Sequence, residues 1–144
     1  MVTTRPATPD DKELLQRVHR ASYRDVVTRQ FGTWDDVDQR SRFDKSLVLE
    51  RSRIVELDGV PIGSMATAEA DDHVFLVGIQ LFPEYQNRGI GSELVTRELA
   101  HAKSLGKPLR LQVLRANDRA RALYERLGFR LIGETEHHFQ MIWG

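Results

Sequence analysis

The stretch that decides the fold reads Leu81-Phe82-Pro83-Glu84-Tyr85-Gln86-Asn87-Arg88-Gly89-Ile90-Gly91-Ser92. The apolar run at residues 74–79 before it is typical of a buried strand. After it, apolar residues recur at helical spacing from Leu94 to Leu105, so we expect a helix from about Ser92. Glycines allow a tight turn, and the first amides of a helix lack intrahelical partners. The stretch therefore predicts a cradle for an anion such as a pyrophosphate.

The Gly-x-Gly pattern at residues 89–91 does not identify the ligand by itself. A P-loop is excluded because no Gly-Lys-Ser/Thr follows. A dinucleotide-binding loop fits badly because residues 92–94 contain no third glycine. An ordinary strand-to-helix turn without a ligand also accounts for these glycines.

A wider pattern resembles the Gcn5-related N-acetyltransferase (GNAT) superfamily. It combines the Gln-x-x-Gly-x-Gly run at 86–91, Pro83 before it, and a downstream block with Asn117, Tyr124 and Leu-Gly-Phe at 127–129. The family signature is Arg/Gln-x-x-Gly-x-Gly/Ala. The resemblance is specific over about residues 74–133, and elsewhere it rests on the order of the elements alone.

Length and composition indicate one ordinary globular domain over residues 1–144. The chain is 40% hydrophobic and 29% charged, which suits a single core. It has no apolar run of the roughly 20 residues that span a bilayer, and its first residues lack the apolar core of a signal peptide. With no cysteine, it has no disulfide, thiol nucleophile or Cys-bound zinc. Cytoplasmic residence is the default expectation.

Charge is unevenly distributed although the net charge is zero. Residues 84–130 contain ten Lys/Arg against five Asp/Glu, a net of +5, and the rest contains eleven against sixteen, a net of −5. The basic part holds the predicted cradle, which suits a polyphosphate. A nucleic-acid partner is not expected because the domain as a whole is not basic.

The N-terminal half predicts two helices between strands. A short strand at 2–7 precedes a helix capped by Thr8, and a second helix begins at Trp34 with Thr33 as a candidate cap. Residues 23–33 either extend the first helix or form a separate turn, which Gly32 ends. The buried face of the first helix is expected to contain Leu14, Leu15, Val18, Ala21 and Ser22.

Residues 53–142 complete a mixed α/β pattern. A hairpin turns at Asp58-Gly59, a third strand covers 73–81, and a strand at 109–113 follows the cradle helix and lies parallel to the third strand. A helix capped by Asn117 or Asp118 leads to a closing pair of strands at 129–133 and 137–142. The order β-α-α-β-β-β-α-β-α-β-β is that of the GNAT-like acyl-coenzyme A N-acyltransferase fold.

The resemblance implies acetyl-coenzyme A as cosubstrate. The strand before the cradle would splay from its parallel neighbour and open a notch for the pantetheine arm. The backbone N–H of Leu81 would polarise the thioester carbonyl. The expected cofactor contacts are Leu81, Phe82, Gln86, Asn87, Arg88, Gly89, Ile90, Gly91, Ser92, Asn117 and Tyr124.

The resembled family carries its general acid on the helix that contains Tyr124, so the resemblance implies this role for Tyr124. A phenol near the thioester sulfur can protonate the departing thiolate. Spacing alone instead favours Tyr124 as a packing residue of an amphipathic helix, and the surrounding family block reverses this preference. Asn117 likewise needs no ligand if it caps that helix.

The general base stays open, because the strand segment 77–81 contains no carboxylate. A water chain is the preferred route, with Glu69 and His138 as the alternatives. The resemblance also implies candidate acceptor-binding residues, namely Tyr23, Trp34, Glu69 and His138. Acids beside an aromatic ring suit a cation. A metal site is rejected, because the adjacent His137 and His138 face opposite sides of a strand.

The predicted enzyme moves acetyl from acetyl-coenzyme A directly to a primary amine of a small molecule, peptide or protein. A catalytically inactive acyl-coenzyme A sensor or structural subunit is the main alternative, and an enzyme for a longer acyl group is another. The resemblance also implies a homodimer through the C-terminal strands. Neither a nucleic acid nor a membrane is expected as a partner.

Overall fold

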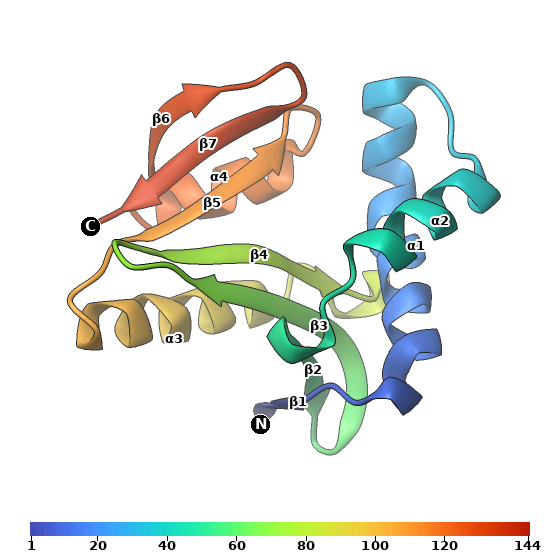
Figure 1. Ribbon diagram of the computed structural model, residues 1–144, viewed down its shortest axis with the longest axis horizontal. Coiled ribbons are helices and arrows are strands. Elements are labelled where there is room, and N and C mark those ends of the chain that lie inside the picture. The colour runs from blue at the N-terminus through green and yellow to red at the C-terminus, as the bar shows by residue number, and fades with distance from the viewer. The chain divides into compact units, whose positions relative to one another are not determined.

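The computed structural model describes all 144 residues and has the predicted element order (Figure 1). This confirms the mixed α/β fold class. Three short 3-10 turns lie at Pro9–Asp11, Leu49–Arg51 and Pro83–Tyr85. The strands and α-helices are β1 (Val2–Pro6), α1 (Lys12–Phe31), α2 (Asp36–Ser46), β2 (Ser52–Leu57), β3 (Val60–Glu69), β4 (Val74–Leu81), α3 (Ile90–Ser104), β5 (Leu109–Leu114), α4 (Asp118–Arg126), β6 (Arg130–Glu134) and β7 (His138–Trp143).

The chain divides into two compact units. Unit 1 contains residues 1–66 and 79–86, and unit 2 contains residues 67–78 and 87–144. The strands follow the order β1-β2-β3-β4-β5-β7-β6, and β3 and β4 contribute residues to both units. The single domain expected for residues 1–144 stays a prediction. No helix is long and apolar enough to cross a membrane.

In unit 1, β1 pairs antiparallel with β2, and the hairpin predicted between β2 and β3 is confirmed. Asp58 and Gly59 form its turn with φ of 51° and 83°, the left-handed conformation that two-residue hairpin turns require.

The helix α1 continues through the ambiguous segment to Phe31 and ends at Gly32, whose φ is 84°. Its buried residues are Leu15, Val18, Val26 and Val27. Ala21, expected on the buried face, is exposed. At about 100° per residue, Ala21 lies about 120° around the helix from Leu15.

The start predicted for the second helix is wrong. Trp34 and Thr33 lie before α2, which begins at Asp36. The cap is Asp35, whose Oδ1 accepts a hydrogen bond from the Asp38 N–H at 3.0 Å. A carboxylate is a stronger N-cap here than a threonine two residues earlier, because it also meets the positive end of the helix dipole.

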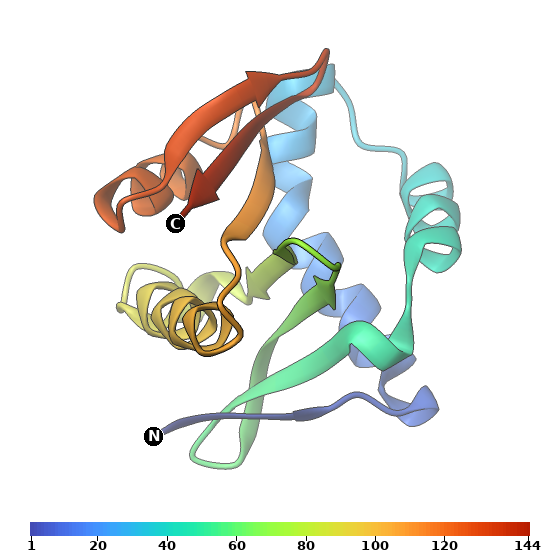
Figure 2. The ribbon, with the colours of Figure 1, turned by 60° about the vertical axis from the view of Figure 1, so that its left-hand side comes forward.

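In unit 2, β4 runs parallel to β5 as predicted, while β7 pairs antiparallel with both β5 and β6. The β6–β7 pair is the red ribbon of Figure 2. The β4–β5 pairing covers only residues 74–76 against 109–111, although β5 continues to Leu114.

Two boundaries in unit 2 differ from the expected ones. The helix α3 begins at Ile90 instead of Ser92, because Gly89 already adopts the left-handed N-cap position with φ of 80°. It ends at Ser104, so Leu105 lies outside it and is 40% exposed instead of buried.

Candidate active site

The predicted anion cradle lies at the start of α3. Asn87 and Gly89 have φ of 61° and 80°, and no side chain caps the helix. The first amides of α3 therefore remain available to an anion, with the positive end of the helix dipole behind them. These backbone groups fit a pyrophosphate.

Packing against the rest of the protein explains neither glycine of the cradle. A Cβ on Gly89 would meet nothing within 4 Å, so its positive φ is the local reason for glycine. A Cβ on Gly91 would lie 3.5 Å from Leu123 Cδ2, an ordinary contact. Close approach of a ligand is thus a better reason for Gly91 than protein packing. The side chain of Arg88 beside them is exposed.

The end of β4 presents backbone donors on one edge. The Phe82 N–H donates to the Ile62 carbonyl of β3 at 3.0 Å. Successive N–H groups of a strand alternate in direction, so those of Leu81 and Ile79 point away from β3. The Leu81 side chain is only 8% exposed, and its carbonyl accepts a hydrogen bond from Gln86 Nε2 at 3.0 Å.

Gly63 of β3 holds this end of β4 in place and was missed in the sequence. A Cβ on Gly63 would lie 2.2 Å from the Gln80 carbonyl oxygen and 2.7 Å from Leu81 Cδ2. Only glycine allows β3 to approach so closely. No local pattern in residues 60–66 reveals this contact.

The pairing between β4 and β5 stops after Leu76, so the next residues of β4 in unit 2 do not pair with β5. Val77 and Gly78 have no pairing partner on β5, and Val77 is 48% exposed. Unpaired backbone groups of this kind can bind an extended ligand, which supports the splaying expected between these two strands.

Tyr124 is a buried residue of α4, 9% exposed, with its ring centroid 5.6 Å from that of Phe129. Asn117 caps the helix, because its Oδ1 accepts from the Ala120 N–H at 3.2 Å. The capping interpretation of Asn117 is therefore confirmed. The packing interpretation of Tyr124 is compatible with a catalytic hydroxyl.

The other expected acceptor residues lie in different units. In unit 2, Glu69 is exposed and 3.3 Å from His101 Nε2, while partial burial, followed by the charge of His137, lowers the pKa of His138. Tyr23 and Trp34 belong to unit 1. No group of three or more His, Asp or Glu side chains could hold a metal ion.

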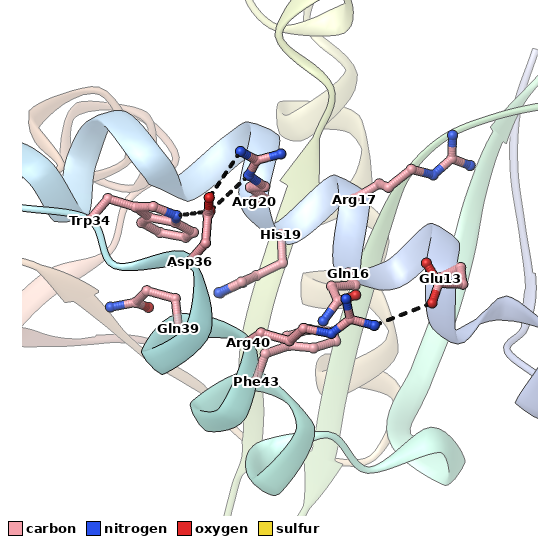
Figure 3. Close-up of a pocket in the computed structure, with 10 residues that line it drawn as sticks. All are labelled: Glu13, Gln16, Arg17, His19, Arg20, Trp34, Asp36, Gln39, Arg40 and Phe43. Atoms are coloured by element: carbon pink, nitrogen blue, oxygen red, sulfur yellow. Dashed lines mark hydrogen bonds and ion pairs between the residues drawn. The ribbon is translucent and has the colours of Figure 1, made fainter.

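A pocket of about 340 Å³ lies between α1 and α2 in unit 1 (Figure 3). Of the predicted acceptor residues, Trp34 lines it. The complete lining is Glu13, Gln16, Arg17, His19, Arg20, Trp34, Asp36, Gln39, Arg40 and Phe43.

His19 lies at the centre of this pocket and was missed in the sequence. Its ring centroid is 5.1 Å from that of Tyr23, 4.9 Å from Phe43 and 6.2 Å from Trp34. Its Nδ1 is 3.2 Å from Gln80 Nε2. Burial lowers the pKa of His19, and the Gln80 bond partly opposes it. The four-residue spacing of His19 and Tyr23 was a usable signal, but the contact of His19 with Phe43 of α2 was not.

Burial also raises the pKa of Tyr23, whose hydroxyl bonds to the same Gln80 side chain. Tyr23 and His19 therefore share the Gln80 side chain as a hydrogen-bond partner. Gln80, which precedes Leu81 on β4, therefore contacts His19 and the predicted acceptor residue Tyr23 of α1.

The acids beside Trp34 do not form a free cation site. Asp36 accepts from Trp34 Nε1 at 2.7 Å and from Arg20 Nε at 3.0 Å. These partners, Trp34 first, hold the pKa of Asp36 below its usual range. Asp35 is used as the cap of α2. The expectation that acids near Trp34 attract a cation is therefore not supported, because both carboxylates already have partners.

A model of the Acetyltransferase (GNAT) family matches residues 13–129. The chain therefore belongs to the GNAT family of acetyltransferases.

Two sequence relatives were found in the curated proteins. A 5-NmdU N-acetyltransferase of Pseudomonas phage PaMx11 is 25% identical over 136 residues, which cover 94% of this chain and 91% of the relative. A mycothiol acetyltransferase of Propionibacterium freudenreichii is 27% identical over 132 residues, which cover 85% of this chain and 41% of the relative. This chain thus spans less than half of the second relative.

Solved structures share the fold. The PaiA N-acetyltransferase of Thermoplasma acidophilum, solved in complex with coenzyme A, aligns with a TM-score of 0.81 at 21% identity, covering 99% of this chain and 98% of that one. The ribosomal-protein-S18-alanine N-acetyltransferase of Escherichia coli aligns with a TM-score of 0.68 at 22% identity, covering 99% of this chain and 90% of that one. Both likenesses show that this chain shares its fold with these acetyltransferases.

Proposed function

We propose that this protein transfers acetyl from acetyl-coenzyme A directly to a primary amine of a small molecule, peptide or protein. The observation that carries the proposal is the uncapped start of α3 behind the left-handed Gly89, in a chain of the GNAT family. A backbone cradle of this type binds a pyrophosphate without a metal ion or a lysine side chain.

Each part of the cofactor has a candidate partner. The backbone of residues 86–92 binds the pyrophosphate, with Arg88 as an added cation. Leu81 and Phe82 bind near the thioester, and the Leu81 N–H, which points away from β3, donates to its carbonyl oxygen. Asn117 and Tyr124 contact the coenzyme A arm from α4.

The chemistry needs one proton donor and one proton acceptor. The amine nitrogen bonds to the acetyl carbon, the carbon–sulfur bond breaks, and Tyr124 gives its phenolic proton to the departing sulfur. The amine proton leaves through a water chain, with Glu69 and His138 as alternative bases. No cysteine exists to hold the acetyl group, which agrees with direct transfer.

A thiol-release screen with acetyl-coenzyme A and a panel of amines and peptides tests this function. We expect thiol release that depends on the acceptor and a mass increase of one acetyl group on its amine. Measurable coenzyme A binding without acceptor-dependent release would favour an inactive sensor or structural subunit. Faster release from longer acyl-coenzyme A esters would favour a different acyl donor.

Two further expectations complete the proposal. The protein acts in the cytoplasm, which cell fractionation tests. It forms a homodimer through its C-terminal strands, which a mass measurement in solution tests.

A further inference from the structure

In unit 2, Arg115, Arg121 and Phe139 form a cluster that joins the start of α4 to the hairpin of β6 and β7. We infer that the members of this arginine–phenylalanine cluster are positioning residues for Tyr124, the proposed general acid. They affect the rate of acetyl transfer through the placement of α4 and not through contact with a substrate. The inference rests on the proposed function, because it assigns the support of that same proton donor.

The first support is Arg115, which ties the loop between β5 and α4 to the turn between β6 and β7. Its backbone N–H donates to the His137 carbonyl at 3.0 Å. Its Nε and Nη2 both donate to the Thr135 carbonyl, at 3.1 and 2.7 Å. Figure 1 shows this turn beside the loop that follows β5. Asn117, two residues after Arg115, caps α4, so the turn holds the loop from which the helix begins.

The second support is the closed structure of this turn. The Thr135 N–H donates to the His138 carbonyl at 2.9 Å, and the Thr135 hydroxyl accepts from the His138 N–H at 3.0 Å. His138 is also paired with Leu114 at the end of β5. The Thr135 carbonyl that Arg115 contacts is therefore held in a defined direction.

The third support is the ring of Phe139 on β7. The Cζ atoms of Arg121 and Arg115 lie over it, 4.2 and 4.8 Å from its centroid, an arrangement in which the ring attracts both cations. Arg121 Nε also donates to Glu125 at 2.8 Å, and Arg115 Nη1 lies 3.8 Å from Glu134. Because each cation has an acid beside it, the cluster suits the joining of protein segments better than the binding of an anion.

The fourth support is the place of Arg121 on α4. Arg121 follows Asn117 by four residues and precedes Tyr124 by three, so the three lie within about 60° of one another around the helix. The Arg121 N–H donates to the Asn117 carbonyl at 3.1 Å. Phe139 therefore holds α4 between its two proposed cofactor contacts.

The distance between donor and acceptor explains why this placement affects the rate. A proton donor works only within hydrogen-bond distance of the atom that it protonates, and a displacement on the order of 1 Å can lower a rate by about 100-fold. Tyr124 is buried and its ring packs on Phe129. Loss of the cluster should therefore shift α4 and leave it folded.

Two arginines of α4 offer a matched pair of variants. Arg121 lies over the Phe139 ring, while Arg126 is exposed. We expect Arg121→Met to lower kcat about tenfold and to change the KM for acetyl-coenzyme A by less than about twofold. Arg126→Met, which removes the same charge from the same helix, should leave both unchanged. A lower melting temperature of Arg121→Met with unchanged kcat would overturn the inference, because the cluster would then be structural only.

The ring of Phe139 can be kept or removed in a second test. Phe139→Tyr keeps the ring face and should retain the wild-type kcat, whereas Phe139→Leu should lower kcat about tenfold. In a Tyr124→Phe background, Phe139→Leu should have no further effect on kcat, because a positioning residue cannot act through an absent donor. Additive losses in the double variant would contradict the inference, because the cluster would then act elsewhere.

NMR of the tyrosine rings separates failure of the positioning role from failure of the proposed function. The chain has three tyrosines, and the signal of Tyr124 is identified by its loss in Tyr124→Phe. With coenzyme A present, we expect this signal to shift in Arg121→Met, which leaves every aromatic ring in place, and not in Arg126→Met. An unshifted signal contradicts the inference even if acetyl transfer occurs. The expected shift without thiol release to any acceptor contradicts the proposed function and leaves the placement of Tyr124 by the cluster supported.

Discussion

The cradle of unit 2 and the pocket of unit 1 are built in opposite ways. The cradle consists of the backbone of a contiguous run, in which Asn87 and Gly89 take left-handed conformations before α3. The pocket consists of side chains, and its central His19 is held by Gln80, 61 residues away. A backbone site is sensitive to conformation and to added Cβ atoms. A side-chain site is sensitive to donors, acceptors and charge, so the two parts should fail differently when substituted.

Removal of one tyrosine hydroxyl from each unit should give the largest contrast. Tyr124→Phe in unit 2 keeps the ring that packs on Phe129 but loses the proton donor, so we expect kcat to fall by about 10²- to 10⁴-fold. The KM for acetyl-coenzyme A and the melting temperature should stay close to those of the wild type. Steady-state kinetics and a thermal melt measure both.

The matched variant in unit 1 is Tyr23→Phe, which loses the hydroxyl bonded to Gln80. We expect a higher KM for the acceptor and a small change in kcat. If Tyr124→Phe turned over at the wild-type rate, Tyr124 would be a packing residue only.

The ion pair between Arg5 and Asp11 tests how much a single buried contact of unit 1 contributes to the free energy of unfolding. Asp11 is buried before α1 and accepts from Arg5 Nη1 at 2.8 Å and Nη2 at 2.9 Å. We expect Asp11→Asn to lower the free energy of unfolding by about 2 kcal/mol at pH 7, the range for charged hydrogen bonds. Asp10→Asn, which removes an exposed charge without an ion pair, should change it by less than about 0.5 kcal/mol.

The pH dependence of the Asp11 effect has a definite sign. The bonds from Arg5, followed by the Thr8 N–H, hold the pKa of Asp11 well below its usual range. The stabilisation is therefore complete above the unfolded pKa of about 3.9 and is lost as the pH falls toward the folded value. Urea unfolding from pH 7 to pH 3 should show a constant gap between wild type and Asp11→Asn, which narrows below about pH 4. A gap that widens in acid would refute this account.

Two glycines with the same conformation test whether the cradle binds a ligand through its backbone. Gly89 in the cradle and Gly59 in the β2–β3 turn have φ of 80° and 83°, and neither has a neighbour within 4 Å of an added Cβ. Alanine at either position should cost about 1 kcal/mol of stability from the left-handed strain alone. Only Gly89→Ala should also weaken coenzyme A binding, measured by calorimetry. Equal affinity in the two variants would mean that the cradle is an ordinary turn.

Sequence reasoning predicted the elements better than their contacts. The hairpin at Asp58-Gly59, the end of α1 at Gly32 and the Asn117 cap depend on residues close in sequence, and all are present. The start of α2 was misplaced because Thr33 and Asp35 both suit a cap, and the acid prevails through its bond to the Asp38 N–H. Ala21 was misassigned because an alanine does not reveal which side of a helix is buried.

The sequence by itself determined the order of the elements, the family and the cradle, because turns, caps and left-handed glycines act over a few neighbouring residues. Only the tertiary structure decided which partners the polar residues of the N-terminal half contact. Three contacts join residues from different elements: the pairing of Asp36 with Trp34 and Arg20, the close approach that requires Gly63, and the hydrogen bond between His19 and Gln80. Such contacts depend on how the elements pack, so no local pattern contains them.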